Sequence, residues 1–319
     1  MSLNPWNLSR RHGVHLYASV VPAVIGLMVS LSFSAPPNAL SSKSLGGLKY
    51  WPGKGVTVER QTIWFELDGL PKQVFRIVAP ELVSDDHGAY LPWGHPSPRQ
   101  WQFEKDRATF AVRIEDVIET KAAVLFADRQ IEVRVKVTNL SDRTWLNANA
   151  FTCFTFTHAD AFDDKRMTRS FVQIGNTWRT LADLFRERSP GGSALTFLGV
   201  RGGPDVQNLW VARQIRQVHP LRLATGSACM LSKDGKWVAG ITTPTPAYVF
   251  NNAGLPCLHA DPLLGNIEPG QSASASSFLH VLRGSLKELV VTTERLRSSA
   301  QRPSRPMERS RKPTTARYI

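Results

Sequence analysis

The sequence predicts an all-β protein, a large antiparallel β-sandwich of the supersandwich type that ends in one helix. Two observations lead to this prediction. Apolar and polar residues alternate with a period of two along most of the chain after residue 57. Groups of Gly, Pro, Asn and Asp separate these segments, as turns do. The composition, 42% hydrophobic and 20% charged, supplies a sizeable core and excludes a disordered chain, a collagen and a polytopic membrane protein.

The segment 130–139 shows the alternation most clearly. Its apolar residues share one face, while Arg134 and Lys136 share the other, so one face is expected to be buried and the other exposed to solvent. The turn sequence that begins at Asn139 predicts a hairpin between this strand and the β-rich run 144–157. Further strands are expected over residues 61–66, 73–78, 109–115, 122–127, 171–173, 194–198, 208–212, 226–231, 236–242, 247–250 and 272–282.

Helical periodicity is scarce. One helix is predicted over Leu286–Arg297, because Ser285 and Glu288 have the spacing of a capping box and the apolar residues after them recur at helical intervals. A short second helix is expected over residues 180–186. Since no linker, repeat or change of composition divides the body, residues 45–298 are expected to form one sandwich, with two smaller sandwiches as the alternative.

The N-terminal segment, residues 1–34, is expected to be a signal peptide or an N-terminal anchor. Arg10 and Arg11 precede an apolar run over residues 16–33, and small residues follow it before Ala35. Pro22 and Gly26 favour a cleaved signal over a permanent span. The expected location is therefore periplasmic or secreted, with membrane anchoring through this segment as the alternative.

The C-terminal tail, residues 299–319, is expected to be disordered. Eight basic residues and one acid lie between Arg295 and Ile319, and large apolar side chains are almost absent there. The tail either contacts an anionic surface or has no partner. No aromatic residues alternate with its arginines, so a specific nucleic-acid partner is not expected.

Two His-x-Asp units are the candidate catalytic residues. His158 and Asp160 follow one predicted strand, and His259 and Asp261 lie in a segment, residues 256–262, that is expected to be a loop. If the two units met, they would offer two imidazoles and two carboxylates, suited to acid–base chemistry or to a metal. The alternative is that each Asp caps a turn and each His packs at the base of a loop.

Aromatic residues supply the candidate substrate-binding positions. Trp93, His95 and Trp101 lie in a long polar stretch between predicted strands, where their rings would stack on the C–H face of a sugar. Trp178 and Arg179 form a further candidate. The alternative for each tryptophan is ordinary packing.

Other chemistries lack their motifs. The sequence contains no phosphate-binding glycine loop before a helix, no G-x-S-x-G and no H-E-x-x-H. Cys153, Cys229 and Cys257 lack zinc-site spacing, so no cofactor and no cysteine-bound metal is expected. In an oxidising compartment, two of these cysteines would form a disulfide. The alternative for Cys153 is burial within its strand as a small apolar side chain.

The runs VTNLSDRTWLNANAFTCFTFTHADAF, GNTWRTLADL and PCLHADPLLGNIEPGQSASASSFLHVL resemble an uncharacterised family of exported bacterial β-sandwich proteins. The resemblance covers residues 57–297. More loosely, the body resembles the sandwich of galactose mutarotases and related sugar-acting domains. That resemblance implies a cleft of histidines and carboxylates on one sheet, for which His158, Asp160, His259 and Asp261 are the counterparts.

Three hypotheses of function follow. In the first, the exported sandwich binds or processes carbohydrate in a cleft lined by His, Asp and Trp, with a histidine as general acid and a carboxylate as base if it is an enzyme. In the second, the protein is a non-catalytic structural or interaction protein of the cell envelope. A third hypothesis is a metal site formed by the two His-x-Asp units. The sequence leaves open whether the protein is an enzyme.

Overall fold

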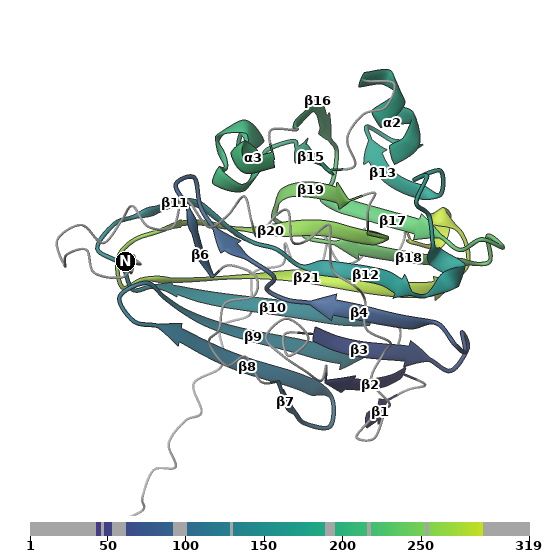
Figure 1. Cartoon of the computed structure of the whole chain (residues 1–319), viewed down its shortest axis with the longest axis horizontal. Coiled ribbons are helices and arrows are strands. Elements are labelled where there is room, and N and C mark those ends of the chain that lie inside the picture. The colour runs from purple at the N-terminus through teal and green to yellow at the C-terminus, as the bar shows by residue number, and fades with distance from the viewer. Residues whose placement is uncertain are drawn as a thin grey trace, which may run out of the picture.

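The computed structural model describes residues 43–45, 48–52, 62–91, 101–127, 130–188, 195–215, 218–252 and 255–289. Within these ranges the chain forms two large, almost entirely antiparallel sheets that pack face to face (Figure 1), which confirms the predicted all-β sandwich. The predicted signal segment, the basic tail and the candidates Trp93 and His95 lie outside the described residues.

The larger sheet has twelve strands. Its main path runs β1-β2-β3-β4-β12-β20-β11-β5-β6, and β19, β15 and β16 extend it beyond the other side of β20. Its strands are β1 (Lys43–Leu45), β2 (Leu48–Pro52), β3 (Thr62–Leu67), β4 (Val74–Val78), β5 (Val83–Ser84), β6 (Ala89–Leu91), β11 (Trp145–Ala150), β12 (Cys153–His158), β15 (Leu195–Val200), β16 (Val218–Leu223), β19 (Pro246–Asn252) and β20 (Cys257–Ile267).

The smaller sheet has nine strands in the order β14-β13-β17-β18-β21-β10-β9-β8-β7. Strand β10 has the predicted bounds, and its predicted apolar face is buried while Arg134 and Lys136 are exposed. The strands of this sheet are β7 (Gln102–Phe103), β8 (Arg107–Ile114), β9 (Ile118–Ala127), β10 (Gln130–Asn139), β13 (Ser170–Ile174), β14 (Thr177–Thr180), β17 (Ser227–Leu231), β18 (Trp237–Thr242) and β21 (Ser272–Arg283).

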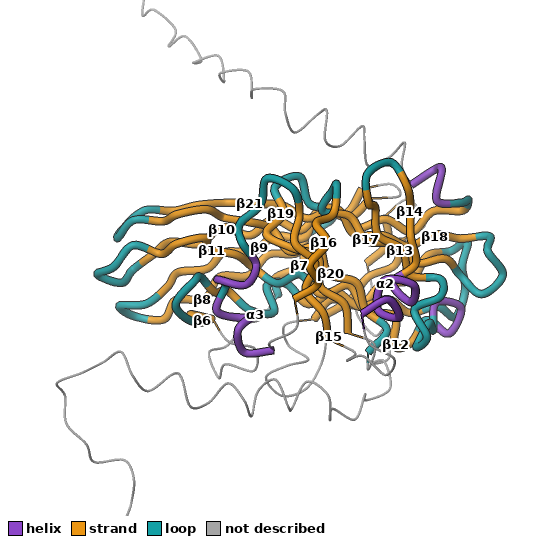
Figure 2. Tube along the Cα trace, turned by 90° about the horizontal axis from the view of Figure 1, so that it is seen from above, coloured by secondary structure: helices purple, strands orange, loops and turns teal. Residues whose placement is uncertain are grey.

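Little of the described chain is helical, as Figure 2 shows. The predicted second helix is present as α2 (Leu181–Arg188), and residues 286–289 begin the predicted C-terminal helix, whose remainder lies outside the described residues. The predicted capping box forms, because the Ser285 N–H donates to Glu288 at 2.7 Å. No helix in the described ranges has the length and hydropathy needed to cross a bilayer. The remaining helical segments are η2 (Asp160–Phe162), η3 (Val206–Asn208) and α3 (Trp210–Ile215).

Three predictions about local structure were wrong. Strands β10 and β11 do not form a hairpin but belong to different sheets, because the Asn139 side chain donates to the carbonyls of Arg143 and Ile267 and holds a crossing turn. Residues 208–212 are helical rather than extended; a short apolar run has no periodicity that separates the two states. Residues 257–262 belong to the central strand β20 rather than to a loop, and they are buried on both faces, so they show no alternation.

Candidate functional site

The outer face of the twelve-stranded sheet, which points away from the smaller sheet, carries polar and aromatic side chains in register. The intervening residues of the same strands, such as Phe65, Phe75 and Phe154, fill the core between the sheets. One row across β2, β3, β4, β12 and β20 consists of Trp51, Trp64, Arg76, Thr155 and Cys257. The next row, across β4, β12, β20, β19 and β15, consists of Val78, Cys153, His259, Phe250 and Phe197.

A buried cluster of one imidazole and two carboxyl groups lies at the centre of this face. Nδ1 of His259 is 3.6 Å from Oδ1 of Asp261, its neighbour two residues along β20. Asp261 Oδ1 also accepts a hydrogen bond of 2.8 Å from the backbone N–H of Thr152, in the interruption between β11 and β12. Glu81 joins the cluster because its backbone N–H donates to the Phe151 carbonyl at 2.9 Å. Glu81, His259 and Asp261 are only 7%, 3% and 0% exposed, so water screens their interactions little.

Burial sets the protonation of these groups. It raises the pKa of Glu81 and of Asp261 above ordinary carboxyl values, and the nearby His259 offsets only part of this effect. Burial alone would lower the pKa of His259, but the neighbouring Asp261 carboxyl raises it. The cluster therefore retains protons on groups that can both donate and accept them.

Two thiols adjoin the imidazole. Ligand atoms of Cys153, Cys257 and His259 all lie within 4.8 Å of one another, and both cysteines are free and buried. Hydrogen bonding to Cys257 and burial raise the pKa of the Cys153 thiol well above its ordinary value. These three residues are the set among the described ones that could hold a metal ion. Antiparallel pairing of β12 with β20 brings Cys153 and Cys257 together, although they are 104 positions apart in the chain.

The opposite end of the face is aromatic and basic. The rings of Trp64 and His158 lie 5.3 Å apart, and the guanidinium of Arg76 lies 5.6 Å from the centre of the Trp64 ring. The indole N–H groups of Trp51 and Trp64 are buried, and neither has a hydrogen-bond partner in the part of the chain that the structure describes. Arg76 and His158 are half-buried, so this end is the more accessible one.

The two His-x-Asp units do not meet. His158 shares the outer face with His259, but it lies five residues beyond Cys153, the partner of His259, which corresponds to about 16 Å of strand. Strand β12 ends at His158, and Asp160 is exposed at the start of η2 rather than beside the imidazole. Only His259 and Asp261 form a pair, so the metal site predicted from both units has no basis in this geometry.

The other predicted binding residues are dispersed. Trp101 is buried in the core, edge-on to Phe110 at 4.6 Å, and does not form an exposed stacking surface. Trp178 and Arg179 lie on β14, at an edge of the smaller sheet. None of these three residues lies on the face that holds His259.

Sequence reasoning missed Arg76, Glu81, Trp51 and Trp64 at this face. A signal for Arg76 was present, since the alternation of VFRIV places it on the face opposite Phe75 and Ile77 in a strand that was correctly predicted. Glu81 follows the strand in an irregular segment, and its approach to Asp261 depends on pairings between distant strands that no local pattern encodes.

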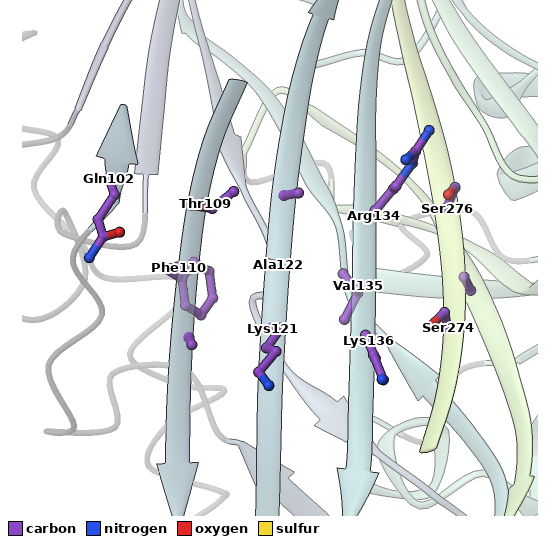
Figure 3. Close-up of a pocket in the computed structure, with 13 residues that line it drawn as sticks. Gln102, Thr109, Phe110, Lys121, Ala122, Arg134, Val135, Lys136, Ser274 and Ser276 are labelled. Carbon is purple, nitrogen blue, oxygen red and sulfur yellow. The ribbon is translucent and has the colours of Figure 1, made fainter. Parts of the chain in front are cut away.

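A groove lies on the far side of the sandwich, on the outer face of the nine-stranded sheet (Figure 3). It has a volume of about 780 Å³ and runs across β7, β8, β9, β10 and β21. Lys121 and Lys136 lie opposite each other on neighbouring strands in this groove. The groove is open between its basic side chains because small residues such as Ser274 form part of its lining. None of the described residues that line it is a histidine or a carboxylate, so the groove suits an anionic ligand.

Comparisons with solved structures find matches of low sequence identity. No family model and no curated protein matches the chain. A galactose mutarotase-related enzyme from Lactobacillus acidophilus is 10% identical, with a TM-score of 0.44 over 76% of this chain and 97% of that one. A putative aldose 1-epimerase from Escherichia coli K12 is 13% identical, with a TM-score of 0.44 over 76% and 98% of the two chains. An α-N-acetylgalactosaminidase from Bifidobacterium bifidum is 12% identical, with a TM-score of 0.45 over 82% of this chain and 39% of that one.

Galactose mutarotase-like proteins, which the sequence resembles, are thus among the structural neighbours of the chain. The neighbours also include an α-N-acetylgalactosaminidase and an α-mannosidase.

Proposed function

We propose that this protein binds a carbohydrate on the outer face of the twelve-stranded sheet and transfers protons to and from it through Glu81 and the Asp261–His259 pair. The observation that carries the proposal is the presence, on one face, of tryptophans, a guanidinium and a buried carboxyl–imidazole cluster. Few purely structural surfaces combine these groups, since buried charges are costly unless they are used or fully paired.

The aromatic end has the chemistry that a sugar requires. A pyranose presents an apolar C–H face to an aromatic ring, and its hydroxyl oxygens accept hydrogen bonds. The buried indole N–H groups of Trp51 and Trp64 are donors without a partner among the described residues, and the Arg76 guanidinium beside Trp64 adds charged donors. A sugar that satisfied the indole donors would recover the free energy that their burial costs.

The acid–base end has the chemistry that a reaction at a sugar's ring oxygens requires. Such a reaction needs one group that donates a proton and one that accepts it. Burial raises the pKa of Glu81 and of Asp261 alike, so either carboxyl can donate a proton and, once ionised, accept one. The half-buried Arg76 and His158 mark the side from which the sugar approaches.

The binding part is tested with two substitutions at the aromatic end. Arg76→Ala is expected to weaken binding at least tenfold, because it removes the charged donors beside Trp64. Trp64→Phe keeps an aromatic ring but removes the indole N–H, and a smaller loss of severalfold is expected. Binding is measured by calorimetry with D-galactose, D-glucose and N-acetyl-D-galactosamine, after a glycan array has shown which sugar classes the wild type retains.

Lys136→Ala is the matched control, since Lys136 is an exposed basic residue in the groove on the opposite face. It is expected to bind like the wild type. A loss of binding in Lys136→Ala together with normal binding in Arg76→Ala would move the site to that groove. Failure of the wild type to bind any glycan would favour a non-catalytic structural or interaction protein.

A further inference from the structure

We propose that Cys153, Cys257 and His259 bind one zinc ion. The three side chains come from two neighbouring strands, β12 and β20, and their ligand atoms lie within 4.8 Å of one another. Their residues are 6%, 2% and 3% exposed, so the strands on which they stand hold them in a rigid, dry environment. Preorganised ligands of this kind need little rearrangement to close around an ion.

The donor set selects a thiophilic cation. Two cysteine sulfurs and one imidazole match the ligands of zinc and are poor ligands for magnesium or calcium, which prefer oxygen. These three protein ligands leave the fourth position of a tetrahedral zinc site open. Asp261 beside the His259 ring is the kind of outer carboxylate that orients a ligating histidine.

The strand register argues against a disulfide between the same cysteines. Cys153 stands directly opposite His259, and Cys257 stands opposite Thr155, so the two cysteines are diagonal neighbours. Diagonal positions in an antiparallel pair have Cα atoms about 7–8 Å apart. A disulfide needs a Cα separation below about 7 Å. A bridging ion spans the two sulfurs without moving the strands.

Zinc binding and carbohydrate binding are separate claims. Zinc binding needs Cys153, Cys257 and His259, while sugar binding depends on Trp64 and Arg76; only the proton transfer shares His259 with the zinc site. With zinc bound, His259 serves as a ligand and Glu81 is the carboxyl left for proton transfer. The zinc proposal therefore goes beyond the proposed function and is tested in the absence of any sugar.

The test is a cobalt titration of the reduced, metal-free protein, followed by zinc. The wild type is expected to bind one Co²⁺, with a thiolate-to-cobalt charge-transfer band in the near ultraviolet, and zinc is expected to abolish that band. Cys153→Ser and Cys257→Ser are each expected to lose it. Cys229→Ser removes the third buried cysteine, which lies on β17 in the other sheet, and is expected to retain it, as is Arg76→Ala.

A measurement on the unaltered chain covers the case in which the serine variants fail to fold. X-ray absorption of the zinc-loaded wild type is expected to show two sulfur ligands at about 2.3 Å and at least one nitrogen at about 2.0 Å. Any one of four results would overturn the proposal. These are an absorption spectrum with only oxygen and nitrogen ligands, no charge-transfer band in the wild type, an unchanged band in Cys153→Ser, and a disulfide between Cys153 and Cys257 in the purified protein.

Discussion

Replacing Phe75 by alanine is expected to lower the free energy of unfolding by about 3–5 kcal/mol. Phe75 is fully buried between the sheets and contacts four other aromatic rings at centroid distances of 5.1–6.0 Å. Those rings come from β3, β12 and η2, so the substitution opens a cavity where three elements meet. Its partners are Phe65, Phe154, Phe156 and Phe162.

Urea denaturation followed by circular dichroism measures this effect. Leu146→Ala is the control, because Leu146 is 38% exposed and its truncation is expected to change stability by less than about 1 kcal/mol. Equal midpoints for Phe75→Ala and the wild type would contradict the description of this aromatic group as the packed core.

Replacing Asp85 by alanine is expected to cost about 3–5 kcal/mol of stability, through electrostatics rather than packing. Oδ1 of the fully buried Asp85 accepts hydrogen bonds from the backbone N–H groups of His87 and Gly88 at 2.6 and 2.9 Å. Oδ2 pairs with the Arg143 guanidinium at 3.4 Å. Alanine leaves these donors and the half-buried cation without their acceptor.

Asp68→Ala is the matched comparison for this prediction. Asp68 pairs with Lys49 at 3.5 Å on the surface, where both side chains are more than half exposed. Its loss is expected to cost no more than about 1 kcal/mol. Similar unfolding free energies for Asp68→Ala and Asp85→Ala, measured by urea denaturation, would argue against a structural role for the Asp85 network.

The fold class was predictable because it depends on local pattern. The alternation in residues 130–139 and in residues 109–115 is a property of single strands, and the structure shows a strand at each place, β10 and β8. Strand β20 was not recognised because residues 257–262 are buried on both faces and so lack alternation. In the sequence, Cys257, His259 and Asp261 are interspersed with apolar residues between two prolines. This pattern is also typical of a loop.

The site was predictable only in part, because it depends on pairing. His259 and Asp261 were recognised as a His-x-Asp unit, but in a segment predicted to be a loop, whereas the structure places them on strand β20 with the two side chains 3.6 Å apart. Their actual neighbours, Cys153, Glu81 and Arg76, come from β12, from the segment after β4 and from β4 itself. Which strands lie side by side is decided by long-range contacts, and the turn after Asn139, which suggested a hairpin, in fact leads the chain into the other sheet.

The most direct test of the central claim, that the outer face of the twelve-stranded sheet is the ligand site, follows the tryptophan indole N–H signals by NMR. Protein labelled with ¹⁵N-tryptophan is titrated with the sugar that the binding experiments select, and signals are assigned with single Trp→Phe variants. The signals of Trp51 and Trp64 are expected to shift on binding, while that of Trp237 on the other sheet stays in place. Binding that leaves the Trp51 and Trp64 signals unmoved would contradict the account.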